Sequence, residues 1–259
     1  MTLFSKVYIN SQIKEVENNL KSILKGLDVE AKVLETTSHG WLQISISGED
    51  ETVALRYLTD EIGVCPTDLA NVARFSTVKG YLNRIDRSAN ELRVDVGIFS
   101  PEHVDAIIPL STLQAQLADG RKLALPKFVE LFDFHKNLPL TIKICDMNKE
   151  NGTIEAELSE RQLALYRSWT MSLLDRLLIL GASINEVLVA LKKAHYDREV
   201  VKIESLGMFE QTVMCKLGTD AAGLIPRIGR NLRKAVFSVY NPRKIMDFFG
   251  VDYALLTSW

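Results

Sequence analysis

The stretch IKICDMNKENGTIEAELS, residues 142–159, contains two runs in which apolar and polar residues alternate. Such alternation predicts two strands, each with one buried face, over residues 140–147 and 152–159. Asn151 and Gly152 lie between the runs, and both residue types tolerate positive φ. The stretch therefore predicts an antiparallel β-hairpin.

Three further short apolar segments precede the hairpin, at residues 77–85, 91–98 and 105–110, with polar residues between them. Residues 121–135 predict a helix that is inserted before the hairpin. Five strands interrupted by one helix are typical of a small closed barrel. We therefore predict an OB-like five-stranded β-barrel over residues 77–159.

The first 64 residues predict a smaller unit. Residues 6–9 form a short predicted strand, and apolar residues at spacings of three and four predict a helix after it. Two alternating segments, 29–34 and 41–47, then predict strands, and residues 49–62 predict a helix that begins with acidic residues. The predicted order is βαββα over residues 1–64.

Residues 160–259 predict a C-terminal α/β unit with two helices and a small sheet. The first helix is expected to begin at the capping box Ser159–Gln162 and to end at Gly181. The second is expected to begin at Ser183–Glu186 and to bury Val187, Leu188 and Leu191. Three apolar segments then predict strands, at residues 199–205, 210–218 and 235–240. The predicted fold class is α+β, in three units.

The chain has 259 residues and a formal net charge of −2, from 31 basic and 33 acidic side chains. This balance excludes binding of nucleic acid through overall positive charge, so any such binding needs a local patch. No apolar run approaches the roughly 18 residues that span a bilayer, and the first residues lack the pattern of a signal peptide. Cys65, Cys145 and Cys215 have no paired spacing, as is typical of free thiols. We expect a cytoplasmic protein without membrane contact.

No motif for nucleotide binding, hydrolysis or metal-dependent proteolysis occurs in the sequence. Glu155 and Glu157 share one face of a predicted strand, and their alternation with apolar residues favours a solvated face over a metal site. The four histidines are scattered, so a zinc site would have to be assembled in three dimensions without the usual paired spacing. We therefore predict no catalytic residue, no metal and no cofactor.

The predicted barrel resembles the S-one-type RNA-binding OB module. The residues that carry the resemblance are Gly80, VDVG at 94–97, AIIPLSTL at 106–113 and the hairpin at 142–159. The resemblance implies RNA binding. Where that family often offers aromatic rings for base stacking, this chain has Val94 and Val96, so the nearest candidates are Tyr81 and Phe99. Whether the barrel binds RNA or is structural stays open.

The whole chain is similar to an archaeal family of conserved proteins known as domain of unknown function 2110. Three stretches carry this similarity: SGEDETVALRYLTDEIG (47–63), EAELSERQLALYRSW (155–169) and CKLGTDAAGLIPRIGRNLRKA (215–235). The resemblance implies an archaeal cytosolic protein and supplies no catalytic residues.

Residues 223–246 gather six cations and contain no acidic residue: Arg227, Arg230, Arg233, Lys234, Arg243 and Lys244. If residues 227–235 form a helix with Pro226 in its first turn, the first four cations share its polar face. Cations at a helix N-terminus oppose the helix dipole, and a bound phosphate would relieve that cost. The alternative is a solvated basic face, neutralised by acids such as Asp220 or Asp247.

These features predict a non-enzymatic protein that binds structured RNA, such as a ribosomal subunit or another part of the translation machinery. The six cations are expected to contact RNA phosphates, with Tyr81 and Phe99 as candidates for stacking. The alternative is a protein-interaction or dimerisation module that docks onto an acidic partner or forms a homodimer. An enzyme that acts on nucleic acid is the third hypothesis.

Overall fold

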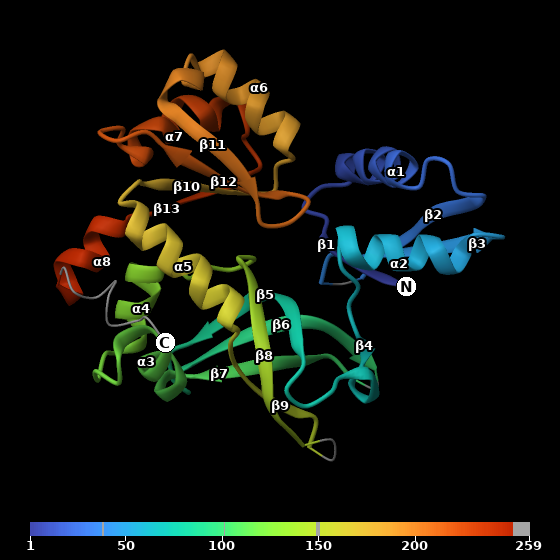
Figure 1. Cartoon of the computed structure of the whole chain (residues 1–259), viewed down its shortest axis with the longest axis horizontal. Coiled ribbons are helices and arrows are strands. Elements are labelled where there is room, and N and C mark those ends of the chain that lie inside the picture. Colours follow the sequence, from blue (N-terminus) through green and yellow to red (C-terminus); the bar gives the residue numbers. More distant parts are fainter. Residues whose placement is uncertain (38, 101, 149–150, 251–259) are drawn as a thin grey trace.

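The computed structural model describes residues 1–37, 39–100, 102–148 and 151–250. Its strands form sheets of three, six and four strands. In Figure 1 the N-terminal unit lies beside the central barrel, and the C-terminal sheet lies above the barrel with α5 between them. None of the described helices is both long and apolar enough to span a bilayer.

The N-terminal unit has the predicted order βαββα. Its elements are β1 (Thr2–Lys6), α1 (Ser11–Ile23), β2 (Val29–Thr36), β3 (Trp41–Gly48) and α2 (Glu51–Glu61). β3 lies between β1 and β2, and both pairings are antiparallel. The helices pack on this sheet around Leu20, Leu42 and Leu58.

The first strand begins at Thr2 rather than at residue 6. All five residues of β1 are buried, because Leu3 faces the N-terminal core while Phe4 packs against Tyr81 of the barrel. A strand covered on both faces lacks the alternation that marks a half-exposed strand, so its position was missed.

The central unit is a closed five-stranded barrel, as predicted. Its elements are β4 (Thr67–Asp68), η1 (Leu69–Asn71), β5 (Thr77–Asp86), β6 (Glu91–Ser100), β7 (Val104–Pro109), α3 (Leu110–Ala118), α4 (Leu125–Phe132), β8 (Pro139–Asn148) and β9 (Thr153–Leu158). β5 pairs with β6 and β8, while β7 pairs with β6 and, in parallel, with β9. The β8–β9 pairing completes the ring. This is an OB-like order of strands.

Two local features explain how the barrel closes. Gly80 is required because a Cβ there would lie 2.6 Å from a Val94 methyl carbon, where β5 and β6 approach closely. Gly152 has φ +60°, as expected for a tight turn, although residues 149–150 of that turn lie outside the described residues. The helix predicted over residues 121–135 is α4, and a second helix that was not predicted, α3, precedes it and ends at Asp119, which has a left-handed conformation.

The C-terminal part contains an antiparallel sheet in the order β11-β12-β10-β13. Its elements are α5 (Glu160–Ser172), β10 (Arg176–Leu180), α6 (Ile184–Ala194), η2 (Asp197–Glu199), β11 (Val200–Ser205), β12 (Glu210–Cys215), α7 (Ala221–Asn231), β13 (Val236–Tyr240) and α8 (Pro242–Phe249). Helices α6 and α7 pack on one face of the sheet, and α5 and α8 lie on the other (Figure 1).

The first C-terminal helix is shorter than predicted. α5 ends at Ser172, because Leu173 adopts φ +54°, and residues 176–180 form the strand β10. Every residue of β10 is buried, and an unbroken apolar run does not distinguish a helix from a central strand. The capping box Ser183–Glu186 is confirmed, whereas Leu188 is exposed rather than buried.

Candidate nucleic-acid interface

Helix α7 begins at Ala221 rather than at Arg227. The Asp220 side chain caps it by accepting hydrogen bonds from the backbone N–H groups of Ala222 and Gly223 (3.0 and 3.2 Å). Pro226 therefore lies inside the helix, and Arg227 and Arg230 lie in its C-terminal half. The helix dipole favours cations there, so the predicted electrostatic cost that called for an anion does not exist.

The four cations between residues 227 and 234 are exposed, and three of them line a groove. This groove has a volume of about 320 Å³ and lies between the end of α7 and the residues just before α6. Arg230, Arg233 and Lys234 line it together with Glu186. We call this groove, together with the four cations Arg227, Arg230, Arg233 and Lys234, the α7 groove.

The α7 groove carries an excess of positive charge. Among the ion pairs of the described residues, none involves its four cations. Glu186 accepts a hydrogen bond from the backbone N–H of Ser183 at 2.9 Å, so this carboxylate serves as part of the α6 cap. The Arg227 guanidinium lies 5.6 Å from the centroid of the Tyr196 ring.

Arg243 and Lys244 lie apart from the α7 groove. They are exposed on α8, which packs with α4 and α5 on the opposite face of the sheet from α7 (Figure 1). Arg243 lines a recess of about 150 Å³ beside Asp175 and Asp220. Burial raises the pKa of Asp175, and Arg243 opposes that rise. The six cations thus form two groups, and Arg243 of the second group has two acidic neighbours.

The outer face of β5 and β6 is covered by the N-terminal unit. OB folds bind oligonucleotides across their second and third strands, which are β6 and β7 here, and on the adjoining surface Tyr81 of β5 and Asp95 of β6 are both 0% exposed. The Tyr81 ring stacks on Phe4, with centroids 4.8 Å apart, and meets the edge of Trp41. Tyr81 therefore has no free ring face for a base, contrary to the prediction that it could stack on RNA. Phe99 is half-buried beside the same cluster.

Asp95 holds the N-terminal unit against this face. Its Oδ2 accepts hydrogen bonds from Lys6 Nζ and Trp41 Nε1, both at 2.8 Å, and its Oδ1 accepts one from the Gly97 N–H at 3.0 Å. Burial alone would raise the pKa of Asp95, but Lys6, Gly97 and Trp41 together hold it below its usual value. The carboxylate is therefore ionised and paired inside the molecule.

Glu210 forms a second buried contact, between all three units. Its carboxylate accepts hydrogen bonds from the Tyr8 hydroxyl at 2.8 Å and from the Tyr81 hydroxyl at 3.2 Å. Burial raises the pKa of Glu210 to about 7, although both hydroxyls and Lys6 stabilise the charged form. Desolvation is thus the dominant effect on this side chain.

Three family models match this sequence in succession. They are the DUF2110 N-terminal domain at residues 1–68, the DUF2110 central domain at 74–170 and the DUF2110 C-terminal domain at 174–240. The chain belongs to the DUF2110 family. The central match extends through most of α5, whose Tyr166 and Trp169 share the hydrophobic core of the barrel. No curated protein matches the chain.

Three solved structures show weak similarity to this chain. The K3L protein from vaccinia virus (Wisconsin strain) is 19% identical, with a TM-score of 0.23, over 34% of this chain and 89% of that one. A chain of the a/eIF2alpha–aDim2p–rRNA complex from Pyrococcus horikoshii OT3 is 13% identical, with a TM-score of 0.26, over 50% of this chain and 70% of that one. The intact alpha subunit of aIF2 from Pyrococcus abyssi is 11% identical, with a TM-score of 0.27, over 65% of this chain and 97% of that one.

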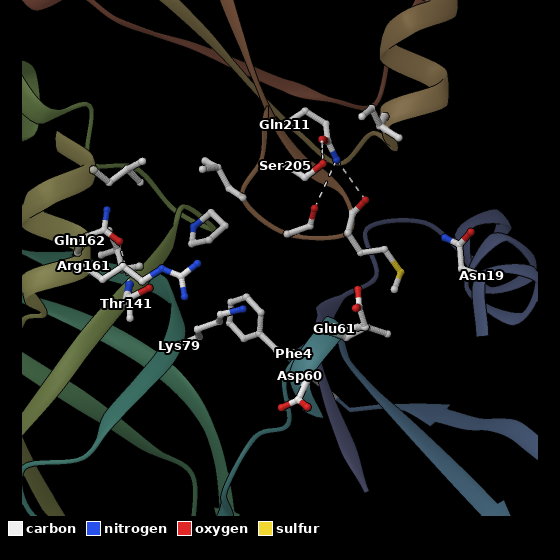
Figure 2. A pocket seen from close by; sticks show the side chains of 18 residues that line it. Phe4, Asn19, Asp60, Glu61, Lys79, Thr141, Arg161, Gln162, Ser205 and Gln211 are labelled. Atoms are coloured by element: carbon white, nitrogen blue, oxygen red, sulfur yellow. Dashed lines mark hydrogen bonds between the residues drawn. The ribbon is translucent and has the colours of Figure 1, made fainter. Parts of the chain in front are cut away.

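A cleft of about 710 Å³ lies where the three units of this DUF2110 protein meet. Figure 2 shows Lys79 and Arg161 on its barrel side, with Asp60 and Glu61 from α2 across from them. Burial lowers the pKa of Lys79, and Arg161 lowers it further. The ammonium of Lys79 lies 5.3 Å from the centroid of the Phe4 ring. This cleft has as many acidic as basic side chains in its walls, whereas Arg230, Arg233 and Lys234 line the α7 groove with one carboxylate, so the cleft suits a polyanion less well.

Ser238, His135 and Asp133 come together between α4 and β13. The Ser238 hydroxyl lies 2.6 Å from His135 Nε2, but His135 Nδ1 and Asp133 Oδ2 have no hydrogen-bond partner among the described residues. A serine–histidine–aspartate triad requires the carboxylate to accept from Nδ1. Burial also raises the pKa of Asp133 and lowers that of His135. The arrangement therefore lacks the relay that activates a nucleophilic serine.

The side chains that join the units, Lys6, Asp95 and Glu210, are not among the predicted site residues. Asp95 had a usable signal, since an acid inside the apolar strand ELRVDVGI breaks its pattern. Lys6 and Glu210 had none, because their partners lie 89 and more than a hundred residues away in the sequence.

Proposed function

We propose that this DUF2110 protein binds RNA without catalysing a reaction on it, and that the α7 groove contacts RNA phosphates. The observation that carries this proposal is the set of exposed, unpaired cations on a chain whose formal net charge is −2. Arginine forks are suited to phosphate oxygens, and release of counterions from RNA drives such binding.

The finer part of the proposal is that the RNA belongs to the translation machinery. It is supported by the OB-like barrel and its resemblance to S-one-type modules, and it is an argument by fold analogy. With the Tyr81 face covered, we propose that the barrel acts mainly as the scaffold that positions the C-terminal sheet, and that phosphates are bound at the α7 groove.

The test is a double charge reversal, Arg230→Glu with Arg233→Glu, measured by RNA binding across a series of salt concentrations. Contacts from Arg227, Arg230, Arg233 and Lys234 to a single strand give a log K against log salt slope of about −3 in the unaltered protein. Loss of two contacts weakens binding roughly 25-fold at 0.1 M salt and reduces the slope by about 1.4. Unrelated RNA sequences should lose affinity equally, since phosphate contacts do not specify bases.

The matched control reverses Lys21 and Lys25, two exposed cations at the end of α1 in the N-terminal unit. Both pairs of substitutions change the net charge by the same amount, so any effect of total charge is shared. Both should leave the free energy of unfolding within about 0.5 kcal/mol, as surface substitutions usually do. The proposal fails if the two doubly substituted proteins bind RNA with the same affinity and the same salt slope.

A further inference from the structure

Two histidines that are far apart in the sequence lie together beside the covered face of the barrel. His39 follows β2, and His103 precedes β7. Their imidazole rings are parallel, with centroids 3.9 Å apart. One nitrogen of each histidine and one oxygen of Asp95 all lie within 4.8 Å of one another.

Two carboxylates face His103 Nε2. Asp95 Oδ1 lies 3.4 Å from it, and Asp105 Oδ1 lies 3.7 Å from it. His39 Nδ1 lies 3.9 Å from Asp95 Oδ2. Four ligands at the corners of a zinc tetrahedron, about 2.1 Å from the ion, are separated by roughly 3.4 Å. These separations are thus close to those of a tetrahedral site.

The carboxylates are held in place from behind. Asn83 donates a hydrogen bond to Asp105 Oδ2 at 2.9 Å, while the Gly97 N–H and Lys6 fix the two oxygens of Asp95. Metal ligands are commonly oriented by such outer hydrogen bonds. The atoms that remain, His103 Nε2 and Asp105 Oδ1, are buried and have no hydrogen-bond partner among the described residues. Buried polar atoms without partners are costly, and a cation between them would remove that cost.

We propose that His39, His103, Asp95 and Asp105 form a binding site for a zinc-type divalent cation. Two imidazoles and two carboxylates suit Zn²⁺ better than Mg²⁺ or Ca²⁺, which prefer all-oxygen sites. The two aspartates carry one more negative charge than Lys6 balances, so the site attracts a cation. One of the parallel rings must turn for both nitrogens to point at one ion, and His39, whose side chain is 35% exposed, has room to do so.

Such an ion would tie the β2–β3 connection to the β6–β7 connection. It would therefore hold the N-terminal unit over the outer face of the barrel, next to the Lys6–Asp95 pair. This role is structural, so it is independent of RNA binding by the α7 groove.

The experiment is a zinc titration of the full chain after treatment with a chelator, followed by calorimetry and thermal unfolding. We expect one ion per chain and a rise in Tm of about 5–10 °C when free zinc is 100-fold above the Kd. In the His39→Gln and His103→Gln variants, both the stoichiometric binding and the rise in Tm should be lost.

Two controls separate this site from other zinc ligands. His195→Asn replaces an exposed histidine just after α6 by a residue that tolerates its φ of +60°, and Cys145→Ser removes the most accessible thiol. Both should keep one zinc per chain. If His103→Gln does not fold, the more exposed His39→Gln still decides the result. The proposal is overturned if the unaltered chain binds no stoichiometric zinc, or if His39→Gln binds it with unchanged affinity.

Discussion

The covered face of the barrel and the α7 groove both gather charged side chains, but they use charge in opposite ways. On the barrel, Asp95 is fully buried and Lys6 lies 2.8 Å from it, so the charges are paired inside the molecule. In the α7 groove, Arg230, Arg233 and Lys234 are exposed and have no ion-pair partner among the described residues. The barrel face beside the usual OB binding strands thus holds the units together, whereas the α7 groove is available to a partner.

The largest expected effect is on the barrel face. Asp95→Ala leaves the Lys6 ammonium and the Trp41 N–H buried without an acceptor, and removal of one partner of a buried pair costs about 3–5 kcal/mol. The measurement is urea unfolding in the presence of a chelator. Adding Lys6→Met should recover part of the loss, because it removes the unpaired charge.

Glu155→Ala, at an exposed carboxylate on β9, is the control and should change the free energy of unfolding by less than about 0.5 kcal/mol. A loss below about 1 kcal/mol for Asp95→Ala would mean that this pair does not hold the face.

The next effect depends on pH and sharpens the contrast on the buried side. The folded pKa of Glu210 is about 7, above the usual value of 4.5, so the folded state binds its proton more tightly than the unfolded state. The contribution of Glu210 to stability is therefore greatest below about pH 4.5 and is lost as pH rises to about 7. The loss can reach about 1.4 kcal/mol per pH unit.

Glu210→Gln removes this titration while leaving an oxygen that can accept from Tyr8 or Tyr81. The difference between the unfolding free energies of the two proteins should change across this pH window in favour of the Gln variant. Unfolding curves at pH 5, 6, 7 and 8 measure it. A difference that is flat over this range would show that Glu210 is ionised throughout.

The smallest expected effect tests the division of the six cations. Arg243→Glu with Lys244→Glu reverses as many charges as the Arg230 and Arg233 pair, but on α8, beyond the sheet. We expect RNA affinity to fall less than about threefold at 0.15 M salt. The Debye length there is about 8 Å, so charges on α8 are largely screened from a strand of RNA bound on the opposite face of the sheet. Fluorescence anisotropy with one labelled RNA measures both pairs. Equal losses would mean that the RNA reaches both faces of the C-terminal sheet.

The barrel could be predicted from sequence because its strands alternate and its hairpin has a clear turn signal. The βαββα order followed from the same kind of local pattern. Two of the errors concern strands that are buried on both faces: β1 was misplaced and β10 was assigned to a helix. A short apolar run fits a buried strand and a buried helix equally well, so its sequence alone does not distinguish them.

The candidate site was predictable only in part. Local charge composition located the α7 groove, since its four cations lie within eight residues. The helix boundary was wrong because Pro226, although favoured in a first turn, was accommodated inside a helix that Asp220 caps. The covering of Tyr81 and the meeting of His39 with His103 depend on contacts between units, and no short sequence pattern encodes such contacts.

The most direct test of the account is to map where RNA touches the protein. RNA that contains 4-thiouridine is crosslinked to the full chain, and the modified peptides are identified by mass spectrometry. We predict crosslinks within residues 181–186 and 227–235 and at Tyr196, lost in the protein with Arg230→Glu and Arg233→Glu. Crosslinks concentrated on β5, β6 and β7, at Tyr81 or Phe99, and unchanged by that double reversal, would contradict the account.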